Sequence, residues 1–159
     1  SANTITIAPA SISSPVSLAP GEVTELAIDS DVELSGTAPF AATQLMVSQL
    51  YAGMSGPSGG GDPSMATLFP TSAWADSYAF HAPASFERRL ALVAPSSASV
   101  TLDGLPVSDW TAIGATGLST ARLTVSLGFH RLAGSAPFSG VSWGYEDYSS
   151  YLVPLGGAL

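Results

Sequence analysis

Short segments in which apolar and polar residues alternate dominate this sequence, and they constrain its fold more than any other feature. In residues 119–128, apolar side chains occupy every second position at Ala121, Leu123, Val125 and Leu127. This period of two is typical of a β-strand with one buried and one solvated face. No window of a dozen residues has the spacing of an amphipathic helix, and the 12 prolines are spread along the chain. The pattern therefore predicts an all-β protein with few or no helices.

Turns rich in Gly, Pro and Ser separate the predicted strands. Asp103-Gly104 lies between two alternating runs and suits a two-residue hairpin turn, because both central residues of such a turn need positive φ. Short strands at this spacing predict an antiparallel β-sandwich, jelly-roll-like or Greek-key, with a β-barrel as the alternative. The predicted strands are residues 22–28, 31–35, 43–51, 76–81, 89–94, 98–102, 110–114, 119–128, 129–133, 140–145 and 150–153.

A chain of 159 residues fits one domain, and no internal repeat is apparent in the sequence. We therefore expect residues 1–159 to form a single β-sandwich domain. The abrupt ending "VPLGGAL" favours an excised piece of a larger protein. The inward positions of the predicted strands give an expected core of Leu26, Ile28, Leu45, Val47, Leu90, Leu92, Val100, Leu102, Leu123, Val125 and Leu127.

Charge and cysteine content exclude several classes of function. The chain has 12 acidic residues against 4 arginines and no lysine, for a formal charge of -8. Nucleic acid is an unsuitable partner, because phosphates are bound by clustered Lys and Arg. The absence of cysteine excludes disulfides, zinc-thiolate sites and thiol nucleophiles. No stretch approaches the roughly 20 apolar residues that a membrane span needs.

The glycine-rich stretch at residues 53–61 is the first candidate for a ligand-binding loop. A phosphate-binding loop would need a Gly-Lys-Ser/Thr end, and the chain has no lysine. Mobile loops often carry binding residues, so Ser58 and Asp62 are candidate ligand contacts. A plain connector that ends at Asp62-Pro63 is the alternative.

A calcium site is a second possibility, with Asp29, Asp31, Asp62 and Asp76 as weak candidate ligands. Calcium takes six to eight oxygen ligands, and the spacing of these acids does not match the twelve-residue calcium loop. The alternative is that they are solvated turn acids. Apart from calcium we expect no cofactor.

The segment "VSWGYEDYSSY" gathers aromatic residues beside two acids. Tyr145, Tyr148 and Tyr151 are candidate contacts for a sugar or a protein partner, because flat amphipathic rings stack and anchor well. The alternative places Trp143 and Tyr145 inward on a strand, and leaves the other tyrosines to brace a corner.

A hydrolase is the least favoured function. The two histidines, His81 and His130, lie in "AFHAP" and "GFHRL", which look like strand ends. No G-x-S-x-G nucleophile motif follows a parallel-sheet pattern.

A set of motifs then occurs in a fixed order: "LMVSQLYAG", "GDPSM", "DSYAFHAP", "LALVAP", "VTLDGLPV", "IGATG", "GFHRLAGSAPF" and "GYEDYSSYLVPLGG". In this order the chain resembles the N-terminal domain family of the IgGFc-binding protein over residues 30–159, most strongly from residue 43. The resemblance implies a secreted or surface-displayed β-rich module for adhesion or binding, with no enzymatic activity. It also implies a structural role for residues 61–64. Animal members carry cysteines, so this chain is more similar to a bacterial relative, and binding of antibody Fc is not carried over.

Residues and resemblance together favour a non-enzymatic extracellular or cell-surface binding or adhesion module. Its loops would recognise a protein or glycan that the sequence does not identify. The alternative is a structural spacer domain in a larger surface protein or filament.

Overall fold

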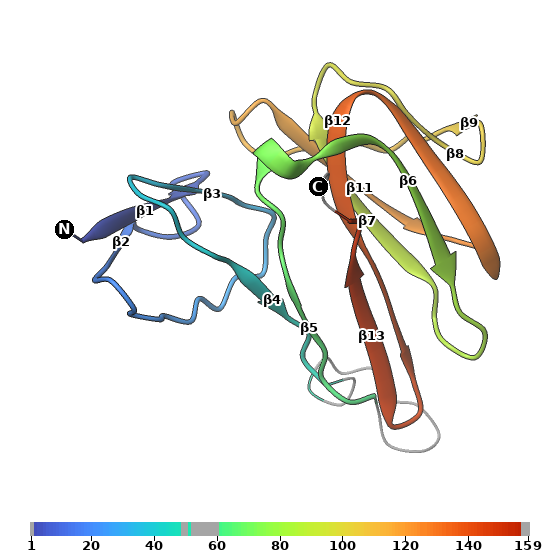
Figure 1. Cartoon of the computed structure of the whole chain (residues 1–159), viewed down its shortest axis with the longest axis horizontal. Coiled ribbons are helices and arrows are strands. Elements are labelled where there is room, and N and C mark those ends of the chain that lie inside the picture. Colours follow the sequence, from blue (N-terminus) through green and yellow to red (C-terminus); the bar gives the residue numbers. More distant parts are fainter. Residues whose placement is uncertain (1, 49–50, 52–60, 157–159) are drawn as a thin grey trace.

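The computed structural model describes residues 2–48, 51 and 61–156, and it confirms an all-β, antiparallel fold (Figure 1). Within these residues the only helical element is the single 3-10 turn η1 (Thr71–Ala73). The strands are β1 (Asn3–Ala8), β2 (Val16–Leu18), β3 (Glu33–Gly36), β4 (Thr43–Leu45), β5 (Met65–Thr67), β6 (Ala75–Ala82), β7 (Arg89–Pro95), β8 (Val100–Leu102), β9 (Leu105–Pro106), β10 (Thr111–Ala112), β11 (Leu118–Thr124), β12 (Gly128–Glu146) and β13 (Ser149–Pro154).

Strand β12 organises the large curled sheet, in which the strand order is β10-β11-β7-β12-β8-β9. Its first part, residues 128–134, pairs with β6 and β8. Its second part, residues 139–146, pairs with β7 and β13. The register shifts between Ala133 and Phe138, so one strand bends and serves both halves of the sheet.

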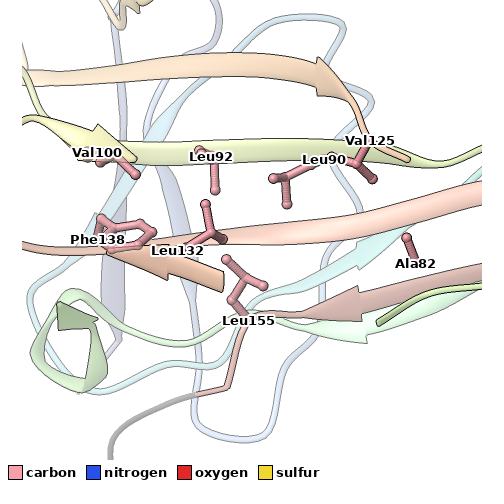
Figure 2. Close-up of a cluster of buried hydrophobic side chains, with 9 residues drawn as sticks. Ala82, Leu90, Leu92, Val100, Val125, Leu132, Phe138 and Leu155 are labelled. Atoms are coloured by element: carbon pink, nitrogen blue, oxygen red, sulfur yellow. The ribbon is translucent and has the colours of Figure 1, made fainter. Parts of the chain in front are cut away.

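The main core fills the space between these two halves. Figure 2 shows Phe138, Leu132 and Leu155 turned toward Leu90 and Leu92 of β7. Four residues of the expected core are confirmed as buried: Leu90, Leu92, Val100 and Val125. Because burial of each large apolar side chain is worth about 1.5–3 kcal/mol, this cluster is the main stabilising element of the curled sheet.

The N-terminal part forms a separate three-stranded sheet of order β2-β1-β3, on the left in Figure 1. The two-stranded sheet β4-β5 leads from it toward the β12–β13 hairpin. A second buried cluster joins β4 and β5 to this hairpin; it contains Met46, Ala66, Val141, Tyr145 and Leu152.

The predicted hairpin turn at Asp103-Gly104 is confirmed. It joins β8 to β9, and both residues have positive φ, 53° and 82°. The side chain of Asp103 also accepts a hydrogen bond from the Arg131 N–H at 2.8 Å, which fastens the turn to β12.

Several strand predictions were wrong. Residues 22–28 alternate like a strand but form none, since no described segment supplies the ladder partner that their backbone N–H and C=O groups need. Residues 129–133 and 140–145 are parts of one strand, β12, because the bend between them is accommodated within a continuous ladder. The alternation also missed β1, β2 and β5, of which the last two are only three residues long.

The expected core was also wrong in part. Leu45, Val47 and Leu127 are exposed, and Leu26, Ile28, Leu102 and Leu123 are only half-buried. Alternation shows which residues share one face of a strand, but it does not show whether a second layer covers that face.

The expectation of no internal repeat was wrong as well. The motif L-x-G-[TS]-A-P-F occurs at residues 34–40 and again at 132–138. The strands around the motif are paired in the same way in both places. β1 pairs with β2 and β3 as β8 pairs with β9 and the first part of β12. The β4–β5 pair corresponds to the second part of β12 with β13. We call residues 3–68 the N-terminal repeat and residues 98–155 the C-terminal repeat.

The two copies of the motif share an unusual contact between a glycine and a phenylalanine ring. A Cβ atom on Gly36 would lie 2.8 Å from Cδ1 of Phe40, and one on Gly134 would lie 2.7 Å from Cδ1 of Phe138. Both distances are too short for any side chain. Glycine is therefore required at this point, because the chain turns back and sets the ring against its backbone.

Candidate binding site at the β12–β13 hairpin

The described residues predicted as ligand contacts gather around one hairpin, the turn between β12 and β13. Tyr145 lies near the end of β12, Tyr148 in the turn and Tyr151 on β13. Asp62 lies beside them in the segment that leads into β5. Ser58 lies outside the described residues.

Tyr145 is buried, and its hydroxyl is used within the chain. The hydroxyl donates a hydrogen bond to the Val47 carbonyl at 2.6 Å, and the ring packs edge-on against Trp143 with centroids 6.0 Å apart. Burial, together with the negative charge of Glu87, raises the pKa of Tyr145. Tyr145 thus ties the hairpin to the N-terminal repeat.

Tyr151 is half-buried, and its ring meets Phe86 edge to face at a centroid distance of 5.3 Å. Its hydroxyl oxygen is buried and has no hydrogen-bond partner among the described residues. Tyr151 therefore braces the hairpin with its ring.

Tyr148 differs from the other two, because 65% of it is exposed. It lies between the end of β12 at Glu146 and the start of β13 at Ser149, with φ at +58°. This backbone conformation is uncommon outside glycine, asparagine and aspartate and is held here by the strands on either side. The tip of the hairpin therefore presents one large aromatic side chain to solvent from a fixed base.

The segment that carries Asp62 packs on the same hairpin. The Asp62 carbonyl accepts a hydrogen bond from the Ser150 hydroxyl, whose oxygen also lies 2.7 Å from Oγ of Ser64. A Cβ on Gly61 would lie 2.8 Å from Cδ1 of Tyr145, so a side chain at residue 61 would not fit. This close packing supports the structural role expected for residues 61–64. The sequence carried no signal for Ser150 or Val47, because serine and valine are common and their partners are distant along the chain.

The candidate calcium ligands do not come together. Asp31 makes a bidentate ion pair with Arg122, at 2.6 and 2.9 Å, and this pair raises the pKa of Arg122. Asp29 and Asp76 each accept a hydrogen bond from the next serine in the chain. In the described part of the chain no three acidic or histidine side chains are grouped as a metal site would need. Calcium binding stays a prediction.

The buried one of the two histidines considered for a hydrolase, His130, lies between two acceptors. His130 Nδ1 lies 2.7 Å from Oδ2 of Asp103, and Nε2 lies 2.9 Å from the Ser126 carbonyl. Burial of the ring opposes its charge, but these two hydrogen bonds and the charge of Asp103 outweigh it and raise the pKa of His130. The hydrogen bond from the Arg131 N–H lowers the pKa of Asp103, and the hydrogen bond with His130 lowers it further. With both nitrogens engaged, the ring has no free nitrogen to activate a hydroxyl.

Two shallow hollows lie away from the exposed tyrosine. One, of about 200 Å³, is lined by residues of β7, β11 and β12 that include Arg89 and Trp143. The other, of about 340 Å³, lies on the N-terminal repeat and is lined by Leu45, Val47 and Met65 among others. Neither hollow is lined by Tyr148.

In the described residues, no helix has the length and apolar character needed to cross a lipid bilayer. Comparison with curated proteins and with solved structures gave no significant match. A family model described as IgGFc binding protein matches residues 1–144, which extends the resemblance to the beginning of the chain but does not include residues 145–159. The chain therefore belongs to the IgGFc binding protein family.

Proposed function

We propose that this chain is a non-enzymatic, secreted or cell-surface module that binds a protein partner through the tip of the β12–β13 hairpin. The family match carries the proposal, because the family is described as a binding protein. In support, both ring nitrogens of His130, one of the two histidines considered for a hydrolase, are engaged in hydrogen bonds.

The location of the proposed contact rests on Tyr148. An exposed tyrosine on a rigid base offers a large contact area at low entropic cost, as binding hot spots do. The hydrogen bonds of Tyr145 to Val47 and of Ser150 to Asp62 supply that base. The acids nearby, Asp62, Glu146 and Asp147, suit a partner with a basic surface.

The test measures binding of the immobilised chain to IgG Fc and to a panel of extracellular matrix proteins and glycans. We expect a protein of the panel to bind, and Tyr148→Ala to weaken that binding by at least about tenfold while the melting temperature stays unchanged. Binding should also weaken as salt concentration rises, since the proposed contact is partly ionic.

Phe129→Ala is the matched control, because Phe129 is also an exposed aromatic residue but lies at the other end of β12. This variant should bind as the parent does. Equal loss in both variants would contradict the hairpin tip as the site. No binding to any protein in the panel would favour the spacer role, and binding to glycans alone would replace the protein partner.

A further inference from the structure

The two repeats agree in their local hydrogen bonds as well as in their strand order. The Thr37 N–H donates to the Thr4 carbonyl at 3.2 Å, and the Ser135 N–H donates to the Ser99 carbonyl at 2.9 Å. The hydroxyls of Thr37 and Ser135 each accept the return bond, from the N–H of residues 4 and 99, at 3.0 Å. At the far end, the N–H of residue 68 bonds to the carbonyl of residue 42 just as that of residue 155 bonds to that of residue 140.

Burial is where the repeats differ. Phe138 is 0% exposed but its counterpart Phe40 is 41% exposed, and Leu155 is 3% exposed but its counterpart Leu68 is 38% exposed. The N-terminal repeat therefore has an uncovered apolar face where the C-terminal repeat has its core.

Two strands cover that face in the C-terminal repeat, β6 and β7. Tyr78 of β6 packs edge-on against Phe138 with centroids 5.1 Å apart, and its hydroxyl donates to the Phe138 carbonyl at 2.7 Å. Leu90 and Leu92 of β7 fill the cluster from the other side (Figure 2). β7 also pairs along the second part of β12 and along all of β11.

The described residues contain no counterpart of β6 and β7 in the N-terminal repeat. Among the described strands, β4 pairs only with β5, so none of them occupies the edge at which β7 would lie. Along the chain, residues 22–28 come between β2 and β3, just as β11 comes between β9 and β12. Residues 22–28 also have the alternation of apolar and polar side chains that is typical of a strand. They form no strand here, which follows if their ladder partner is the missing counterpart of β7.

The spacing of the chain indicates where that counterpart belongs. Asn3 corresponds to Ala98, since Thr4 corresponds to Ser99. β7 ends at Pro95, which is three residues before Ala98. A counterpart of β7 with the same spacing would end three residues before Asn3, at the position directly ahead of Ser1. A second copy of this chain is a poorer source, because donating its own β6 and β7 would uncover its own core.

We propose that the uncovered face of the N-terminal repeat is the docking site of an antiparallel β-hairpin with the apolar alternation of β6 and β7, joined directly ahead of Ser1 in a longer chain. The hairpin adds a strand to the open edge of β4 and covers Phe40 and Leu68. It also gives residues 22–28 a partner, so that they become a strand. The chain then holds two complete units of one fold.

One difference between the repeats shapes the fit of this hairpin. β7 is paired with β12, and at Gly140 the two strands are so close that a Cβ there would lie 2.9 Å from Cδ2 of Leu92. The N-terminal repeat has Ala42 at the corresponding position. The docked hairpin therefore crosses β4 less closely than β7 crosses β12.

The experiment joins a second copy of residues 75–95 directly ahead of Ser1, which keeps the spacing of the C-terminal repeat. The fusion is made in the parent sequence and with Ala42→Gly, which restores the close crossing. Amide hydrogen exchange of residues 22–28 is compared with that of the unfused chain. We expect at least about tenfold slower exchange in one of the fusions, with a loss of binding of an apolar fluorescent dye.

The control fusion replaces the added Leu90 and Leu92 by serine and should leave residues 22–28 exchanging as fast as in the unfused chain. Unchanged exchange in both apolar fusions would overturn the proposal. So would a concentration-dependent dimer of the unfused chain that Phe40→Ser abolishes, since a second copy would then cover the face.

Discussion

The two repeats of this chain have nearly the same local geometry and opposite surroundings. Gly134 and Gly36 receive a phenylalanine ring in the same way, to within 0.1 Å in the distances to Cδ1, 2.7 and 2.8 Å. Yet one ring is fully buried and the other is two-fifths exposed. The comparison teaches that the L-x-G-[TS]-A-P-F motif sets the turn and the position of the ring. Strands from elsewhere in the chain then decide whether the ring enters a core.

The same comparison shows that a strand needs both a local alternating pattern and a neighbouring strand from elsewhere in the chain. β11 has seven paired residues because β7 lies beside it, whereas the alternating residues 22–28 have no ladder partner among the described residues and form no strand. A strand pattern is therefore a necessary condition for a strand and not a sufficient one. Its backbone groups must also find acceptors and donors on a neighbour.

The largest effect expected is on the buried ring. Phe138→Ala should lower the free energy of unfolding by roughly 3–5 kcal/mol, because it leaves a cavity in a fully covered site. Phe40→Ala should cost only about 1 kcal/mol, because its ring is partly in water already. Chemical denaturation monitored by circular dichroism measures both. Equal losses would mean that the two repeats are covered alike in solution, and the contrast drawn here would fail.

A smaller effect is expected where the two repeats touch. Tyr145→Phe removes the hydrogen bond to the Val47 carbonyl and should cost about 1 kcal/mol of unfolding free energy. Tyr148→Phe is the control, since its side chain is exposed and it should leave stability unchanged. Exchange of the amides in β4 and β5 would show whether the loss loosens the N-terminal repeat. A neutral Tyr145→Phe would show that water replaces the bond.

The smallest effect concerns pH, and it belongs to the C-terminal repeat alone, because the N-terminal repeat has Val32 at the position that corresponds to His130. Because the pKa of His130 is raised in the folded state, its contribution to stability is complete below the unfolded value of 6.5 and is lost as pH rises through the folded pKa. Stability should therefore decline modestly as pH rises above about 6.5.

His130→Val should flatten this decline, whereas His81→Val, a change at an exposed histidine, should not. Nuclear magnetic resonance titration of the His130 ring gives a direct reading and should have its midpoint above 6.5. A midpoint below that value would contradict the pairing with Asp103.

The candidate site was predicted only in outline. The sequence indicated the aromatic segment, and the structure brings Tyr145, Tyr151 and Asp62 to the hairpin that carries Tyr148. The sequence could not indicate that the Tyr145 hydroxyl donates a hydrogen bond to the Val47 carbonyl, because these residues are far apart in the chain. Nor could it separate the exposed Tyr148 from the two other tyrosines, because the turn between them reverses the alternation of faces.

The alternating pattern, the Asp103-Gly104 turn and the absence of helical periodicity determined that this protein is antiparallel and all-β. These are local properties, since a residue's neighbours along the chain decide its backbone conformation and the face to which it points. Tertiary structure alone decided that β12 serves both halves of the curled sheet and that Phe138 is buried while Phe40 is not. It also decided that residues 22–28 find no ladder partner in the described part of the chain. Burial and strand pairing depend on segments that meet only after folding, and alternation within one segment does not specify which segments those are.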